Sequence, residues 1–119
     1  MGMTSVKMKV MSSSDPKRSY QGEFLVDSGA HFTVLPKAVW EGLGLRSEGE
    51  QEFGLAEGKV ITRKIGNALV EFRGETRATP VVLGNKDDSP LLGIITLEAL
   101  GLGLDPFKRE LYKAKLMLA

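Results

Sequence analysis

The sequence predicts an all-β fold, a sandwich or a barrel, formed by one domain that spans residues 1–119. Short runs of alternating or β-branched apolar residues recur along the chain, and turn residues separate them every eight to twelve positions or so. No linker or low-complexity segment divides these runs. The chain has 119 residues, which suits a single domain with a small core.

The N-terminal part of the chain is expected to begin with a β-hairpin. Residues 6–11 alternate apolar and polar side chains, which is the periodicity of a strand with one buried face. An Asp-Pro turn follows, and residues 19–27 form the second strand of the hairpin. Residues 35–45 then predict a short helix, with Pro36 at its first position and Gly42 or Gly44 at its end.

The middle of the chain is punctuated by glycine and rich in β-branched residues, so residues 51–84 predict several short strands. The first pair is expected to turn at residues 56–58. A second turn is expected near residues 73–75, and residues 81–83 read as a buried strand.

The C-terminal part predicts a loop, a short helix and a last strand. Residues 84–90 are polar and should form an exposed loop, after which a short strand ends at Gly93. Thr96 is expected to cap the N-terminus of the short helix with its hydroxyl group. A turn then leads into a final strand within residues 111–118.

Composition narrows the range of functions. The formal net charge is +1, from 16 basic and 15 acidic residues, which gives no broad field for nucleic acid or an anionic membrane. There is no cysteine, which excludes a disulfide framework, a cysteine nucleophile and thiolate metal sites. No apolar run approaches the length of a membrane span or a signal peptide. We therefore expect a soluble, cytoplasmic chain without nucleic-acid or membrane partners.

Asp27 stands where an apolar strand ends. The run Phe-Leu-Val stops at Asp27-Ser28-Gly29, and apolar residues resume at residues 32–36. Because an ionised carboxylate is costly to bury, this acid lies in a solvated turn or is kept for its chemistry. Ser28 offers a hydroxyl group and Gly29 permits a tight turn. Asp-Ser-Gly on its own is also an ordinary surface turn.

Three segments, in order, resemble the retropepsin-like (clan AA) aspartic proteases, and in particular their small, single-domain microbial branch. "FLVDSGAHFTVLP" is similar to the active-site segment of the family, and "PLLGIITLEALGL" is similar to its later apolar-apolar-Gly segment and the helix that follows. "FGLAEGKVI" lies where the family has its flap hairpin. The likeness extends from about residue 7 to residue 112. It implies a retropepsin-like closed β-barrel with one or two short helices, and an aspartic endopeptidase that needs no metal or cofactor.

The family mechanism needs two carboxylates. Held close together, they share one proton, because two like charges at that distance cannot both be ionised. One carboxylate acts as the base on a water molecule that attacks the peptide carbonyl, and the other donates to the carbonyl oxygen. The chain has one such motif, since its other aspartates lie in predicted turns and loops. A homodimer with Asp27 from each subunit on a two-fold axis supplies the second carboxylate.

The resemblance also implies roles for neighbouring residues. Ser28 would bond across the two-fold axis, and residues 6–10 and 111–118 would interleave at the floor of the dimer. The flap would close over an extended peptide or protein substrate by a form of strand addition. The residues expected to support Asp27 are Ser28, Gly29, Ala30 and Gly93, and those expected at the flap tip are Ala56, Glu57 and Gly58.

Two positions depart from the viral members of the family. His31 stands where they usually carry an acid, and Ile94 stands where they carry its arginine partner, so this ion pair is absent. Its absence leaves open a catalytically weak or inactive module that binds peptides or dimerises on the same fold. A chain that dimerises only on substrate or at high concentration also remains open, as does an ordinary hairpin in place of the flap. A Ser28–His31 nucleophile and base would lack a glycine elbow and an orienting acid.

Overall fold

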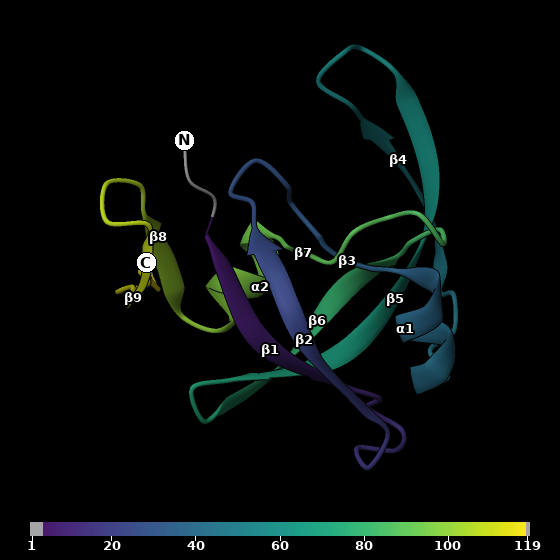
Figure 1. Ribbon diagram of the computed structural model, residues 1–119, viewed down its shortest axis with the longest axis horizontal. Helices are drawn as coiled ribbons and strands as arrows, with labels where there is room; N and C mark the ends of the chain where they lie inside the picture. Colours follow the sequence, from purple (N-terminus) through teal and green to yellow (C-terminus); the bar gives the residue numbers. More distant parts are fainter. Residues whose placement is uncertain (1–3, 119) are drawn as a thin grey trace.

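The larger sheet of the molecule is curved and closes on itself (Figure 1). The computed structural model describes residues 4–118. The elements in chain order are β1 (Ser5–Met11), β2 (Ser19–Val26), β3 (Thr33–Leu35), α1 (Lys37–Leu43), β4 (Gly49–Gly54), β5 (Val60–Phe72), β6 (Glu75–Leu83), β7 (Leu91–Leu92), α2 (Ile94–Ala99), β8 (Leu102–Asp105) and β9 (Glu110–Lys113).

The order of the strands explains the closure. Seven strands are adjacent in the order β1-β2-β7-β3-β6-β5-β4, and β1 also pairs with β5. This additional pairing joins the sheet into a ring and leaves β4 as an outer strand on β5. The all-β closed fold with two short helices that the sequence predicted is confirmed. A smaller sheet of β8 and β9 lies to one side (Figure 1).

The core fills the inside of the ring. In parts of β1, β2, β3 and β5, buried residues alternate with more exposed ones, as the period of a β-strand requires. The largest buried side chains come from β1, β2, β3, β5, β6 and β7, and they are Met8, Val10, Phe24, Leu35, Val70, Val81 and Leu92. The β1–β2 hairpin forms as predicted, with Val10 opposite Tyr20.

Helix α1 follows β3 directly. Pro36 is its N-cap, so the helix begins at Lys37, one residue later than expected. Gly44 ends the helix with a left-handed backbone (φ 71°), which confirms the second of the two predicted stops. The indole Nε1 of Trp40 donates to the Gly84 carbonyl at 2.8 Å, which ties α1 to the loop that leaves β6.

The C-terminal part differs from the prediction in two ways. Helix α2 begins at Ile94 with Gly93 as its N-cap, so the assignment of Thr96 as the cap was wrong. Thr96 is fully buried within the helix, where its hydroxyl bonds to other side chains. The last strand ends at Lys113, because it pairs with the unpredicted strand β8, which is only four residues long.

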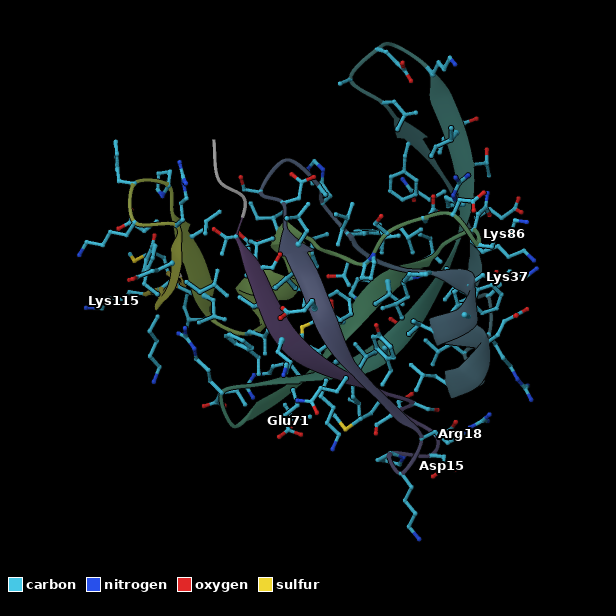
Figure 2. All side chains as sticks on the ribbon, viewed as in Figure 1. Asp15, Arg18, Lys37, Glu71, Lys86 and Lys115 are labelled. Atoms are coloured by element: carbon cyan, nitrogen blue, oxygen red, sulfur yellow. The ribbon has the colours of Figure 1, made fainter. Side chains whose placement is uncertain are left out.

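The surface carries charged side chains of both signs. The labelled side chains in Figure 2 lie at the periphery of the molecule, on the β1–β2 turn, on α1, at the end of β5, on the loop after β6 and near the C-terminus, and they are Asp15, Arg18, Lys37, Glu71, Lys86 and Lys115. Within residues 4–118, no helix combines the length and the apolar character needed to cross a membrane.

Candidate active site

Asp27 is the first residue after β2, and its backbone is fixed on both sides. Its N–H donates to the Leu92 carbonyl of β7 at 3.1 Å, so the parallel pairing of β2 and β7 continues one residue beyond β2. Its own carbonyl accepts the Ala30 N–H at 3.1 Å, which closes a tight turn over Ser28 and Gly29. The acid therefore stands at the rigid end of a core strand.

The Asp27 carboxylate is held by its own turn. Its Oδ1 accepts the Gly29 N–H at 2.9 Å, the local bond that aspartate makes when it starts a turn. Among the hydrogen bonds within residues 4–118, none engages Oδ2. The residue is half-buried and borders a cleft, so the carboxylate keeps contact with solvent and avoids the cost of full burial.

Gly93 lies behind the Asp27 turn. A Cβ atom at this position would lie 2.4 Å from the Phe32 carbonyl carbon and 2.8 Å from the His31 carbonyl oxygen, so only glycine fits. This close approach lets the start of α2 form hydrogen bonds to residues 30 and 31, since the Ile94 N–H donates to the Ala30 carbonyl at 2.8 Å. Ile95 N–H likewise donates to the His31 carbonyl at 2.9 Å. The glycine therefore supports the loop from behind.

A cleft of about 540 Å³ opens beside Asp27. Its walls come from the Asp27 turn, the β4–β5 hairpin and the loop after β6. The hairpin projects from the closed sheet (Figure 1) and turns at residues 56–58, as predicted, with Gly58 in a left-handed conformation. The residues that line the cleft are Asp27, Gly29, Ala30, His31, Phe32, Val34, Phe53, Gly54, Leu55, Ala56, Ile61, Arg63, Val82, Asp88, Ser89 and Leu91.

The cleft brings together some of the residues expected at the site and not others. Asp27, Gly29, Ala30 and Ala56 border it. The other predicted residues, which do not border it in this single chain, are Ser28, Gly93, Glu57 and Gly58. Ser28 is exposed and Gly93 is buried behind the loop. Among the hydrogen bonds within residues 4–118, none joins the Ser28 hydroxyl to His31, so the nucleophile-and-base alternative gains no support.

An aromatic pair that the sequence reasoning missed joins the hairpin to the Asp27 loop. The rings of Phe32 and Phe53 meet edge to face, with centroids 5.7 Å apart and planes at 72°. Phe53 is the one residue of β4 that is not exposed. The alternation of β4 could have identified Phe53 as its inward side chain, but no sequence signal indicates Phe32 as its partner.

An ion pair joins β5, the other strand of the hairpin, to the loop that follows β6. Arg63 Nε of β5 lies 3.2 Å from Asp88 Oδ2, and the same oxygen accepts the Asn85 N–H at 2.7 Å. Asp88 was expected only as a loop acid. Among the described residues 4–118, Asp88 is the second acid that lines the cleft, after Asp27. Its negative charge is compensated by the guanidinium of Arg63. In this same part of the chain, no group of three or more acids or histidines is placed to hold a metal ion.

The chain is similar to known proteins in both sequence and fold. A model of the family described as "gag-polyprotein putative aspartyl protease" matches residues 18–99. Among solved structures, EIAV protease in complex with the inhibitor HBY-793 is similar, with a TM-score of 0.62 and 18% identity over 98% of this chain and 94% of that one. The solution structure of the simian foamy virus (mac) protease is also similar, with a TM-score of 0.52 and 16% identity over 78% of this chain and 92% of that one. No curated protein sequence matches.

Proposed function

Because the chain belongs to the family of gag-polyprotein putative aspartyl proteases, whose model covers residues 18–99, we propose that it is an aspartic endopeptidase. The viral protease structures it resembles share its fold, and this likeness supports the same assignment. Asp27 is the residue to which we assign the chemistry, because it is the acid of the Asp-Ser-Gly turn and borders the cleft.

The active enzyme is a homodimer that places two Asp27 carboxylates together. Among the described residues 4–118, the cleft holds one other carboxylate, that of Asp88, which is engaged by Arg63 and by the Asn85 N–H and so is not free to pair with Asp27. A two-fold axis next to the Asp27 turn supplies a second, identical carboxylate without any further residue. Ser28 is exposed on the same turn, which leaves its hydroxyl accessible to a partner subunit.

The paired carboxylates share one proton and divide the chemistry. The ionised member takes a proton from a water molecule, whose oxygen attacks the peptide carbonyl carbon. The protonated member donates to the carbonyl oxygen, and the tetrahedral intermediate then collapses as its nitrogen gains a proton and leaves as an amine. The bond between Gly29 N–H and Oδ1 fixes the carboxylate plane, so that Oδ2 is presented for this exchange.

The substrate is an extended peptide that lies in the cleft beneath the β4–β5 hairpin. The cleft is lined mainly by apolar side chains, among them Phe32, Phe53 and Ile61, and so it suits peptides with large apolar residues near the cleaved bond. The hairpin offers backbone donors and acceptors above the peptide, as in strand addition. Ala56, Glu57 and Gly58 form its tip.

The observation that carries the proposal is the position of Asp27, at the end of a core strand, in a turn that presents its carboxylate to a cleft. Replacing Asp27 with Asn keeps the size of the side chain and removes the charge. We expect D27N to lower kcat/KM for a peptide library by a factor on the order of 10³ or more, as loss of a central group does in other hydrolases. D87N, in the exposed loop after β6, is the matched control and should retain full activity.

The oligomeric state of each variant completes the experiment. D27N should sediment as the same dimer as the unchanged protein, because the substitution leaves the fold intact. Peptide cleavage that persists in D27N would exclude Asp27 as the catalytic acid. A wild-type protein that binds peptides without cleaving any of them would favour the binding module instead.

A further inference from the structure

Three buried threonines form a chain of hydroxyl groups behind the Asp27 turn. Thr33 of β3, Thr79 of β6 and Thr96 of α2 are 0%, 2% and 0% exposed. Thr33 Oγ1 donates to Thr96 Oγ1 at 2.6 Å, and the Thr96 and Thr79 hydroxyl oxygens lie 2.9 Å apart. Three elements distant in sequence therefore meet through side-chain hydroxyls in a place that water does not reach.

The direction of the hydrogen bonds among the three threonine hydroxyls follows from counting their protons. A threonine hydroxyl has a single proton to donate. Thr79 donates its proton to the Pro80 carbonyl at 3.2 Å, and Thr33 donates its proton to Thr96. Thr96 must then donate to Thr79. At its other end, Thr33 Oγ1 accepts the Gly93 N–H at 3.1 Å, so the bonds run in one direction from Gly93 to Pro80.

One peptide group connects the three hydrogen-bonded threonine hydroxyls to Asp27. The N–H of the Leu92–Gly93 peptide donates to Thr33 Oγ1, while the carbonyl of the same peptide accepts the Asp27 N–H at 3.1 Å. The peptide is planar and rigid, so fixing its N–H also fixes the direction of its carbonyl. The hydroxyl of Thr33 thereby sets the position of the bond that holds the Asp27 backbone.

We propose that Thr96 is a positioning residue for Asp27, acting through Thr33 and the Leu92–Gly93 peptide. Without the Thr96 oxygen, the Thr33 hydroxyl loses its acceptor and rotates toward another. Its lone pair then turns away from Gly93, and the peptide that carries the Asp27 bond is free to tilt. The effect on catalysis rests on the proposed protease activity, whereas the effect on the two backbone bonds does not.

The hydroxyl, and not the volume of the side chain, is what this role requires. Valine, like threonine, is branched at Cβ and has nearly the same shape, so T96V removes the hydroxyl oxygen while the side chain keeps almost the same volume. Serine keeps the oxygen and loses a methyl group. T96V and T96S therefore separate the hydrogen-bond chain from core packing, since packing alone would make T96S the more harmful substitution.

Amide hydrogen exchange at single residues tests the positioning without reference to activity. In T96V we expect the Asp27 and Gly93 amides to exchange about tenfold faster, as the loss of one buried hydrogen bond allows, relative to the amides of β1 and β2. T96S should behave like the unchanged protein. Equal acceleration of all amides would mean general destabilisation and would overturn the proposal, as would no change at Asp27.

Steady-state kinetics adds a second readout. We expect T96V to lower kcat by about tenfold with KM changed less than about twofold, because a misplaced catalytic group slows chemistry more than binding. A wild-type protein without cleavage dependent on Asp27 would overturn the proposed function, and amide exchange would still test the positioning. Normal kcat in T96V, beside an inactive D27N, would overturn the positioning alone.

A milder variant serves if T96V does not fold. T79V removes the hydrogen bond between Thr79 and Thr96, which is one bond further from Gly93 than the bond that T96V removes. The exchange of the Asp27 and Gly93 amides should therefore rise by only about threefold, with T79S as the control. A T79V protein whose Asp27 and Gly93 amides match those of T79S would overturn the proposal.

Discussion

The two sides of the cleft are held by different kinds of interaction. The Asp27 turn is bonded through its backbone to β7 and to the start of α2, and it lies in front of a buried chain of hydroxyls. The β4–β5 hairpin projects from the closed sheet, and five of the six residues of β4 are exposed. A rigid Asp27 turn and a less firmly held hairpin suit a site that must keep its acid fixed and still admit an extended peptide.

Replacing glycine with alanine in each of the two regions should give the largest difference in stability. A Cβ at Gly93 would overlap the Phe32 backbone, whereas a Cβ at Gly54 on β4 would meet no atom within 4 Å. We expect G93A to lower the free energy of unfolding by roughly 2–3 kcal/mol, and G54A to change it by less than about 0.5 kcal/mol. Thermal or urea unfolding of the two variants measures the difference. Equal stabilities of G93A and G54A would show that the backbone around Gly93 is not tightly packed.

The aromatic contact between Phe32 and Phe53 should account for the next largest effect. Removing the Phe53 ring deletes the inward contact of β4, so F53A should speed amide exchange in residues 50–62 by about fivefold while β1 and β2 change little. A double-mutant cycle with F32A should give a coupling of about 0.5–1.5 kcal/mol. Additive effects of F32A and F53A would indicate that the two rings do not hold the hairpin.

The ion pair between Arg63 and Asp88 should contribute least. Its side chains are 20% and 29% exposed, compared with 48% and 50% for the pair of Arg77 and Glu75 on β6. A cycle of R63Q and D88N should give a coupling of about 0.2–1 kcal/mol that falls as salt is added. The cycle of R77Q and E75Q is the matched control and should lie near zero. A larger coupling in the exposed pair would contradict the view that the pair of Arg63 and Asp88 helps to hold the hairpin.

Local pattern was sufficient to predict much of the fold and part of the site. The alternation of residues 6–11, the turn at residues 56–58 and the acid after the apolar run at Asp27 are short-range features, and the structure places them as expected. The family resemblance added the closed sheet, which pattern alone left as a sandwich or a barrel. Asp27, Gly29, Ala30 and Ala56, which the sequence had singled out, border one cleft, and their roles there stay a prediction.

The contacts that shape the site could not be predicted in this way because they join distant residues. Thr33 and Thr96 are 63 positions apart, and a threonine near a helix start is ordinarily a cap. The structure differs because the N-cap is Gly93, three residues earlier, so Thr96 lies within the helix and is buried in the core. Asp88 likewise was expected only as a loop acid, but the fold brings it within 3.2 Å of Arg63, 25 positions earlier in the chain.

The pairing of two Asp27 carboxylates is the central claim, and a crystal structure of the protein bound to a peptide-like inhibitor tests it most directly. The proposed mechanism predicts a two-fold dimer in which the Asp27 carboxylates of both subunits lie within hydrogen-bond distance of each other and of the inhibitor's central hydroxyl. An inhibitor bound in the cleft of a single chain, with no second Asp27 near the first, would contradict it.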